Sequence, residues 1–247
     1  LKDTHRILLS SGRGEHKTPG EFRTSQNWIG GAGLADAVFV PPAYNALPEL
    51  LSDFELFLNN DELKIPDLIR IAIAHYQFET IHPFLDGNGR IGRLLITLYL
   101  VSAGILDKPL LYLSEFFERN KGLYYDNLTF VRTKNDLSQW IRFFLAGVVE
   151  TAENSAATLK KMMDLKEHIE KEQIILLGKR SKQGLDFFHK LFKKPIVSVK
   201  TVQSMTGLSP KAANDLVQVF VERKILVETT GYQRNRVFVF KDYLKLF

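Results

Sequence analysis

The sequence predicts a mainly α-helical protein in two parts, with a small β-hairpin in the first part and a mixed helix-and-strand region at the end. On both sides of residues 82–93, apolar residues recur at spacings of three and four, which is typical of buried helix faces. Residues 26–42 contain two apolar runs around a glycine-rich tip, which indicates a hairpin. After Pro195, two helix patterns precede two strand patterns.

The composition is that of a soluble globular protein, since 45% of the residues are apolar and 25% are charged. A chain of 247 residues can form one large domain or two ordinary ones. Cysteine is absent, which excludes disulfides, thiolate metal ligands and cysteine nucleophiles. No apolar run approaches the ~18 residues of a membrane helix. We therefore expect a cytoplasmic protein with no membrane segment.

Charge is unevenly distributed along the chain. Residues 1–159 hold 15 lysines and arginines against 19 aspartates and glutamates, whereas residues 160–247 hold 18 against 9. Two parts with different partners would explain this difference, and chance variation of a solvated surface is the alternative. We predict a first domain over residues 1–150, a helical linker over 151–194 and a second domain over 195–247.

Turn-forming residues are frequent in residues 10–25, which are predicted to form a loop. The hairpin follows, with arms at 26–29 and 38–40, and Pro41 and Pro42 end its second arm. In a helical domain such a hairpin leaves unpaired strand edges. These edges could accept an extended peptide by strand addition.

Helices are predicted for the rest of the first domain. The pattern of residues 47–58 predicts one helix, and Pro66 suits the first position of the next. This next helix leads into the segment 82–93, whose last residues open a third helix, so the segment forms a loop between two core helices. Residues 112–146 continue as helices, and 138–177 form a long helical stretch with a solvated later part.

The segment 82–93, His-Pro-Phe-Leu-Asp-Gly-Asn-Gly-Arg-Ile-Gly-Arg, combines an imidazole, a carboxylate, a Gly-Asn-Gly turn and two arginines. Gly87 and Gly89 allow backbone angles closed to other residues and let a ligand approach closely. The free N–H groups at a helix N-terminus bind anions. Arg90 and Arg93 are three residues apart and share a helix face beside these groups. Guanidinium groups suit phosphate oxygens, so the segment predicts a phosphate site.

Asp86 and His82 complete the chemistry of this segment. A carboxylate within an anion site is repelled unless a cation lies between them, and Mg²⁺ shared by Asp86 and a polyphosphate meets that need. His82 can be neutral and basic at pH 7, because an imidazole has an ordinary pKa of ~6.5. Together these groups predict chemistry at a nucleotide phosphate, with His82 as the general base that activates a hydroxyl.

The same segment matches the Fic signature H-P-F-x-[D/E]-G-N-G-R-x-x-R at every specified position, so the chain resembles the Fic family. The resemblance implies a Fic-type helical bundle and the transfer of AMP from ATP, with Mg²⁺, to a protein hydroxyl. It also implies roles for the matching residues: His82 as base, Asp86 as Mg²⁺ ligand, Gly87, Asn88 and Gly89 as anion hole, Arg90 and Arg93 as ligands of the β- and γ-phosphates, and Phe84 as the apolar anchor of the loop.

The hairpin resembles the Fic flap, which docks the target protein beside the histidine. By this resemblance the flap covers about residues 26–42, and Ile29, Gly30 and Gly31 are the expected target contacts. A simple connector between helices is the alternative interpretation.

Two further features resemble Fic proteins. Glu79 belongs to a Phe-Glu pair that Fic proteins often carry just before the motif, and we expect it to support the loop rather than to react. A later segment similar to one common in Fic proteins contains Tyr124 and Tyr125. These tyrosines could flank the nucleotide, and packing in the core is the alternative.

The C-terminal region predicts a winged-helix (α+β) domain, which many Fic proteins also carry. Residues 201–205 suit a short helix, and residues 209–222 suit a second helix with Ser209 as its N-cap. Strands at 226–228 and 236–240, joined by a polar turn, would form the wing. A helix-turn-helix followed by two strands is the order of a winged helix.

Lys211, Arg234 and Arg236 are the candidate DNA contacts of this domain, since they could reach phosphates. The second helix also carries Asp215 and Glu222, which weakens the case for DNA. Docking of another protein or a dimer contact therefore stays open as the alternative, and we expect a homodimer.

One regulatory element of many Fic proteins has no match. This element is an inhibitory helix with the pattern [S/T]-x-x-x-E-[G/N], whose glutamate pairs with the second motif arginine, here Arg93. Residues 11–16 and 114–119 carry the serine and the glutamate but end in His16 and Arg119. Because the sequence begins without Met or a signal-peptide pattern, we expect a fragment whose inhibitory helix lies in a preceding segment.

Two functions from different classes are consistent with the sequence. One is an enzyme that attaches AMP to Ser, Thr or Tyr hydroxyls of a target protein, with the chain itself as one possible target. The other is a DNA-binding regulator whose Fic domain senses a nucleotide. Within the enzyme class, another nucleotide or phosphate donor, or the removal of AMP, remains an alternative.

Overall fold

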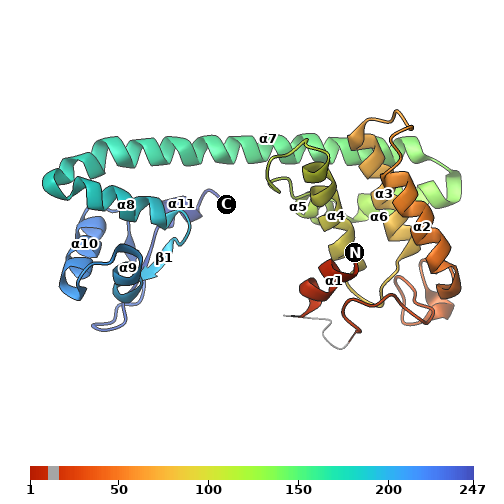
Figure 1. The fold of residues 1–247 in the computed structure, drawn as a ribbon, viewed down its shortest axis with the longest axis horizontal. Coiled ribbons are helices and arrows are strands. Elements are labelled where there is room, and N and C mark those ends of the chain that lie inside the picture. Colours follow the sequence, from red (N-terminus) through yellow and green to blue (C-terminus); the bar gives the residue numbers. More distant parts are fainter. Residues whose placement is uncertain (11–16) are drawn as a thin grey trace. The chain divides into compact units, whose positions relative to one another are not determined.

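The structure is a computed structural model that describes residues 1–10 and 17–247. Part of the predicted loop 10–25 and the incomplete match at 11–16 to the inhibitory pattern lie outside the described residues. The chain forms two compact units, Leu1–Glu153 and Asn154–Phe247, which are called unit 1 and unit 2. Both consist mainly of helices (Figure 1), as the sequence predicts. No described helix is long and apolar enough to cross a membrane.

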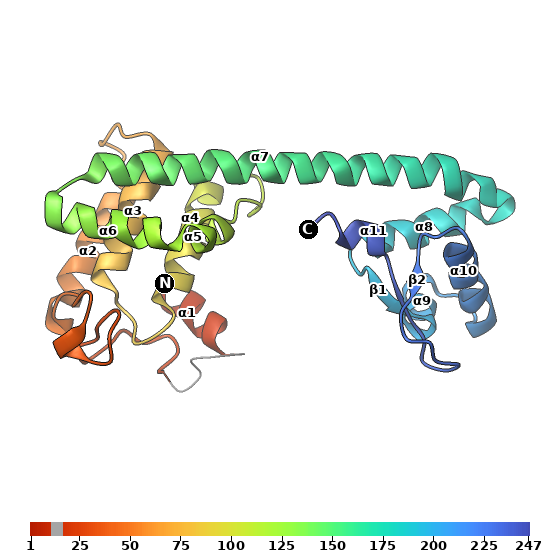
Figure 2. The same cartoon turned by 180° about the vertical axis from the view of Figure 1, so that it is seen from behind.

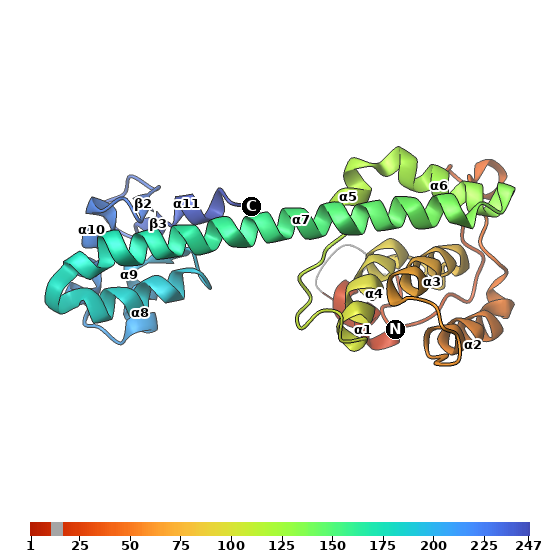
Figure 3. The ribbon, with the colours of Figure 1, turned by 90° about the horizontal axis from the view of Figure 1, so that it is seen from above.

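Unit 1 is a bundle of helices. In chain order its elements are α1 (Lys2–Leu9), the 3₁₀-helices η1 (Leu34–Asp36) and η2 (Tyr44–Ala46), α2 (Leu47–Leu58), α3 (Asp67–Ile81), α4 (Asn88–Ser102), α5 (Ser114–Arg119), α6 (Lys121–Lys134) and the first part of α7 (Leu137–Ile169). Helices α3 and α4 pack side by side, and α2 packs on α3 (Figure 3). The predicted helix at 47–58 is confirmed, and the motif segment joins α3 to α4.

The core of unit 1 is apolar and rich in aromatic rings. It includes Ile71, Phe78 and Ile81 of α3, together with Ile91 and Ile96 of α4. From α7, Trp140 is completely buried and donates from Nε1 to the Ala72 carbonyl of α3 at 2.8 Å. The two helices that hold the motif are therefore fixed against each other and against α7.

The predicted flap hairpin is reduced to one bridge. Ile29 and Phe39 pair in antiparallel orientation, and each donates its N–H to the carbonyl of the other, at 2.9 and 3.1 Å. Regular pairing stops there because Gly30 and Gly31 have left-handed φ angles of 72° and η1 follows in the tip. The chain therefore reverses where the hairpin was predicted, but the arms at 26–29 and 38–40 form no regular strands beyond this bridge.

Unit 2 combines helices with a small sheet (Figure 2). After the end of α7 its elements are the π-helix η3 (Glu170–Ile174), the 3₁₀-helix η4 (Ile175–Arg180), α8 (Ser181–Leu191), β1 (Ile196–Ser198), α9 (Val199–Thr206), α10 (Pro210–Glu222), β2 (Val227–Glu228), β3 (Val237–Val239) and α11 (Lys241–Leu244). Strand β3 lies between β1 and β2 and is antiparallel to both. Ser209 caps α10 by accepting the Ala212 N–H at 3.3 Å.

The segment that the sequence analysis assigned to a linker contributes to the core of unit 2. Its side chains Ile169, Ile174, Phe187, Phe188 and Leu191 are buried with residues of α9, α10 and β3. The charged face of α7 suggested a solvated helix, and its lysines are indeed exposed. The apolar face that begins near Ile169 belongs to the core of unit 2, which the sequence did not lead us to predict.

Candidate active site

The motif loop, residues 82–87, lies between the end of α3 and the start of α4. His82 follows the last residue of α3 and has left-handed backbone angles, φ 48° and ψ 60°. Gly87 precedes α4 with φ 81°, a conformation in which glycine is favoured. Helix α4 thus begins at Asn88, and the N–H groups of its first turn have no partners within the helix. This helix start is the place where the sequence predicts an anion site.

Phe84 anchors the loop in the core. Its ring is completely buried and stacks on His5 of α1, with centroids 3.8 Å apart. Asn88 closes the loop with its side chain, because Oδ1 accepts the Phe84 N–H at 2.9 Å and Nδ2 donates to the Phe84 carbonyl at 2.7 Å. The amide of Asn88 is therefore occupied within the loop. Its backbone N–H, at the first position of α4, can serve the predicted anion hole.

Asp86 lies at the edge of the α4 N-terminus. Its Oδ1 accepts the Gly87 N–H at 2.6 Å, and its Oδ2 is 3.9 Å from a guanidinium nitrogen of Arg90. The carboxylate is one-third exposed, so a cation bound to it could keep water ligands. Arg93 extends over Gly89, where an added Cβ would lie 3.2 Å from its Nη1. Carboxylate and arginines therefore surround the helix start.

His82 has the protonation state that a general base needs. Its Nδ1 lies 3.3 Å from the Glu79 carbonyl oxygen, and because a carbonyl can only accept, Nδ1 carries the proton. Nε2 is then left with its lone pair. Burial lowers the pKa of His82 to about 4, so the imidazole is neutral at pH 7.

Glu79 is a buried carboxyl beside this imidazole. It is 6% exposed, and its Oε2 lies 4.0 Å from Nδ1 of His82. Burial raises the pKa of Glu79 to about 7, although the charges of Arg93 and Arg132 act in the opposite direction. Gly92 makes room for it, since an added Cβ would lie 2.3 Å from Oε1. The expected support role of Glu79 is compatible with this position.

A cavity of about 460 Å³ joins the motif to the flap and to α6. It is lined by Ile29, Gly30, Val38 and Phe39 of the flap, by Glu79, His82 and Gly89, and by Tyr125, Leu128, Thr129 and Arg132 of α6. The structure thus brings His82, the start of α4 and two expected target contacts together. Of the expected target contacts, Gly31 does not line this cavity.

The two tyrosines of α6 differ in position. Tyr125 lines the cavity, whereas Tyr124 is 5% exposed and shares a hydrogen bond of 3.0 Å with Nε2 of the buried His75. Tyr124 is therefore a core residue, the alternative that the sequence left open. Arg132 was missed by the sequence analysis. Its guanidinium lies 3.7 Å from the ring centroid of Phe39 and connects α6 to the flap.

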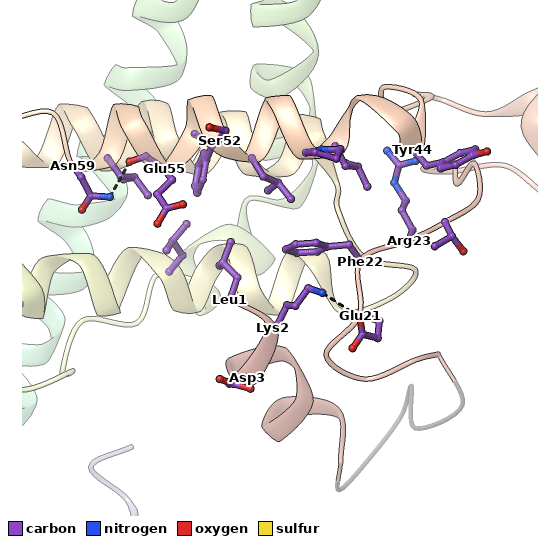
Figure 4. Close-up of a pocket in the computed structure, with 17 residues that line it drawn as sticks. Leu1, Lys2, Asp3, Glu21, Phe22, Arg23, Tyr44, Ser52, Glu55 and Asn59 are labelled. Carbon is purple, nitrogen blue, oxygen red and sulfur yellow. Dashed lines mark hydrogen bonds and ion pairs between the residues drawn. The ribbon is translucent and has the colours of Figure 1, made fainter.

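A larger groove of about 1020 Å³ lies between α1, residues 21–24 and α2 (Figure 4). Its lining combines apolar side chains such as Phe22 and Leu51 with the exposed ion pair of Lys2 and Glu21. It contains none of the residues predicted for catalysis or phosphate binding. Size alone therefore does not mark the candidate active site.

The candidate DNA contacts of unit 2 are not equivalent. Lys211 near the start of α10 and Arg234 in the turn before β3 are exposed. Arg236 is partly buried and donates to Oδ1 of Asn214 at 3.0 Å, with its guanidinium over the ring of Phe238. Arg236 thus connects α10 with β3, and only the other two are fully available to a partner.

Comparison with known proteins agrees with this geometry. Residues 1–100 match the family described as the Fic/DOC family. Proteins named "Protein adenylyltransferase Fic" from Aedes aegypti and Culex quinquefasciatus are 38% and 36% identical over 147 and 144 residues. These matches cover 58% of this chain but only 26% of each relative.

Solved structures show the same fold. A Fic family protein from Desulfovibrio desulfuricans G20 is 23% identical and matches with a TM-score of 0.55 over 96% of this chain and 66% of its own. A Fic domain containing signaling protein from Bacteroides thetaiotaomicron is 21% identical, with a TM-score of 0.50 over 62% of this chain and 59% of its own. Residues 1–100 of this chain thus match the Fic/DOC family model, and the chain shares its fold with solved Fic proteins.

Proposed function

We propose that unit 1 transfers AMP from ATP to a hydroxyl group of a protein side chain. The observation that carries the proposal is the placement of His82. Its neutral ring, with the lone pair on Nε2, lines a cavity that also contains Gly89 at the start of α4 and residues of the flap. A base, an anion site and a docking surface thus share one cavity, as group transfer requires.

In the proposed reaction, Nε2 of His82 takes the proton of the target hydroxyl as its oxygen attacks the α-phosphorus of ATP. The bond from this phosphorus to the oxygen that bridges to the β-phosphate breaks. AMP stays on the target oxygen, and pyrophosphate leaves. The N–H groups at the start of α4 stabilise the charge on the α-phosphate, and Arg90 and Arg93 bind the β- and γ-phosphates.

Asp86 is the residue that would hold Mg²⁺. Among the residues that the structure describes, no group of three or more histidines and carboxylates could hold a metal ion. A cation bound to Asp86 would therefore take most ligands from the triphosphate and water, which suits Mg²⁺. When bound, Mg²⁺ would neutralise charge on the triphosphate and on the leaving pyrophosphate.

The target would be a Ser, Thr or Tyr side chain on a segment that pairs with the flap. Support comes from the single bridge between Ile29 and Phe39, because the peptide groups next to it are not in regular pairing. Self-modification would give a first signal in the absence of a known target.

For residues 195–247 we propose a winged helix, supported by the order β1, α9, α10, β2 and β3. Its partner could be duplex DNA, another protein or a second copy of this chain. A shift of duplex DNA at low salt that disappears in Lys211→Gln and Arg234→Gln variants would favour DNA. Absence of binding at low salt would leave a protein partner.

The main experiment compares ATP labelled in the α- or the γ-phosphate. With Mg²⁺, wild-type protein should incorporate only the α-label, and mass spectrometry should locate an added AMP. His82→Ala should lose transfer yet still bind ATP, whereas the exposed His168→Ala should behave as wild type. Incorporation of the γ-label would indicate phosphoryl transfer instead, and full activity in His82→Ala would exclude this histidine as the base.

A further inference from the structure

Arg23 holds the backbone at the junction of α3 and the motif loop. Its Nε donates to the His82 carbonyl at 3.0 Å, and one Nη2 hydrogen bond of 3.3 Å reaches the Ile81 carbonyl. Its own backbone N–H donates to the Pro83 carbonyl at 2.9 Å. One residue of the N-terminal segment thus binds three successive carbonyl groups around the histidine.

Asn27 and His5 continue these contacts along the loop. Nδ2 of Asn27 donates to the carbonyls of His82, at 3.3 Å, and of Phe84, at 3.1 Å. Nε2 of His5 donates to the Asp86 carbonyl at 3.0 Å, since its Nδ1 accepts the N–H of Gly20 at 2.8 Å. Side chains far away in the sequence therefore fix the loop through its backbone, whatever side chains the loop carries.

The backbone of His82 needs such contacts. The left-handed conformation is unfavourable for a residue other than glycine, and φ of His82 is 48°. The carbonyl of His82 is bound by Arg23 and Asn27, while its ring is bound through Nδ1 to the Glu79 carbonyl. Backbone and ring are thus fixed at once, which defines where Nε2 lies.

We propose that Arg23 and Asn27, which we call the carbonyl clamp, are positioning residues that hold His82 in its left-handed conformation and so direct Nε2 at the incoming hydroxyl. The inference rests on the proposed function in that His82 is taken as the base. It assigns no chemical step to the clamp itself.

Arg23 fits this role by charge and by shape. It is only 2% exposed, and its remaining hydrogen bonds go to the carbonyls of Ser25 and Pro42. No carboxylate pairs with it among the described residues. The C-terminal end of α3 carries partial negative charge, which a guanidinium offsets, and its planar fork reaches several carbonyls at once. Figure 4 shows Arg23 pointing toward Tyr44 rather than toward Glu21.

The charge of Arg23 also favours the neutral imidazole. Burial is the main cause of the lowered pKa of His82, and the charges of Arg23 and Arg132 lower it further, whereas Asp86 raises it. Loss of Arg23 should therefore raise the pKa of His82 and loosen its backbone. A purely structural arginine elsewhere would do neither.

The kinetic test compares Arg23→Gln and Asn27→Ala with Arg119→Gln, an exposed arginine of α5 that pairs with Glu150. A displaced base should lower kcat for AMP transfer about 100-fold in Arg23→Gln. KM for ATP should stay near the wild-type value, because the start of α4 binds the phosphates. Arg119→Gln should match wild type. Arg23→Lys should recover little, since one ammonium cannot replace the fork.

An unchanged kcat in a folded Arg23→Gln protein would overturn the proposal. So would a loss of kcat that only follows the fraction of unfolded protein. If Arg23→Gln does not fold, Asn27→Ala carries the same test, because it keeps the arginine and removes two hydrogen bonds to the loop.

A second readout does not depend on activity. The ¹⁵N NMR signals of the His82 ring report its tautomer and its titration in wild type and Arg23→Gln. The clamp predicts a single Nδ1–H tautomer in wild type and a mixture with a higher pKa in the variant. If wild type transfers no AMP but the signals change in this way, the proposed function fails and the clamp stands. Identical signals in both proteins would refute the clamp alone.

Discussion

Units 1 and 2 differ in what they bury. Among the described residues, the buried polar and charged side chains all belong to unit 1, and they are His5, Arg23, Asn27, Arg70, His75, Glu79, Asn88, Thr97 and Asn127. The described residues that are buried in the core of unit 2 have aliphatic or phenyl side chains. Buried polar groups cost free energy unless they are hydrogen-bonded. Unit 1 therefore carries more of this cost than unit 2, where Oε1 of Gln173 is a buried polar atom without a hydrogen-bond partner.

Most of that polar interior is directed at one place. Arg23 and Asn27 bind loop carbonyls, Asn88 closes the loop on Phe84, and Nδ1 of His75 bonds the Gly92 carbonyl of α4 at 3.0 Å. Unit 1 thus uses buried polar side chains to fix a loop with a left-handed residue.

The largest effect is expected at Asp86, the carboxylate proposed to hold Mg²⁺ beside the triphosphate. Asp86→Ala removes the only motif carboxylate, so Mg²⁺ and the triphosphate lose an anchor. We expect kcat/KM for AMP transfer to fall about 100- to 1000-fold, with a higher Mg²⁺ requirement. Transfer assays over a Mg²⁺ titration measure this, with exposed Asp164→Ala as the control. An unchanged Mg²⁺ dependence would remove Asp86 from the metal site.

The apolar core of unit 2 should respond in stability instead. Phe220 is completely buried against Phe187, and Phe220→Ala should lower the unfolding free energy of unit 2 by about 3–5 kcal/mol. Peptide-resolved hydrogen exchange should show faster exchange in α10 and β3, with α3 and α4 unchanged. Equally faster hydrogen exchange in both units would mean that they unfold together, and the two cores would then not be independent.

Acid should affect unit 1 through its histidines. Burial lowers the pKa values of His75 and His82 to about 4, so both rings bind protons more readily in the unfolded chain. Their contribution to stability is present above pH ~6.5 and is lost as pH falls towards 4, by at most about 3 kcal/mol per ring. Glu79, with its pKa raised to about 7, opposes this, because its contribution declines as pH rises through that value.

Urea unfolding followed by tryptophan fluorescence isolates this effect, because both tryptophans, Trp28 and Trp140, lie in unit 1. The urea concentration at the unfolding midpoint should decrease as the pH is lowered from 6.5 to 4.5, because the effect of two histidines exceeds that of one glutamate. Glu79→Gln should make that fall steeper. A midpoint that does not depend on pH would show that these groups are not buried as described.

The smallest effects are expected at the surface of unit 2. Arg236→Gln loses the bond to Asn214 and should cost about 1 kcal/mol of local stability, whereas Arg234→Gln should cost nothing measurable. Hydrogen exchange in α10 distinguishes the two variants. An equal effect of both would mean that the contact between β3 and α10 does not persist in solution.

The motif could be predicted from local sequence signals. The contacts that residues far away in the sequence make with it could not. Glycines, helix periodicity and the residue types of 82–93 placed the loop between two helices, and Ser209 marked the start of α10. The contacts of Arg23 and Asn27 were not predicted, because a backbone carbonyl has no sequence signature. The motif residues therefore do not indicate which side chains bind their backbone. Arg132 was missed for a related reason, since only the fold brings α6 to the flap.

Short elements were hardest to predict. Strand β1 has three residues and exists because it pairs with β3, which lies much later in the chain. The flap has no regular strands at its predicted arms, because glycine-rich segments support several backbone conformations. Helix α8 was not predicted separately, because it lies in a charged stretch. For β1, tertiary pairing rather than local propensity decided the structure.

The proposed function requires that the loop present a neutral imidazole whose Nε2 can accept a proton. A ¹⁵N NMR titration of the His82 ring in the wild-type protein tests this requirement directly. We predict an Nδ1–H tautomer at pH 7 that binds no second proton until the pH approaches about 4. Protonation near the ordinary value of ~6.5, or an Nε2–H tautomer at pH 7, would contradict it.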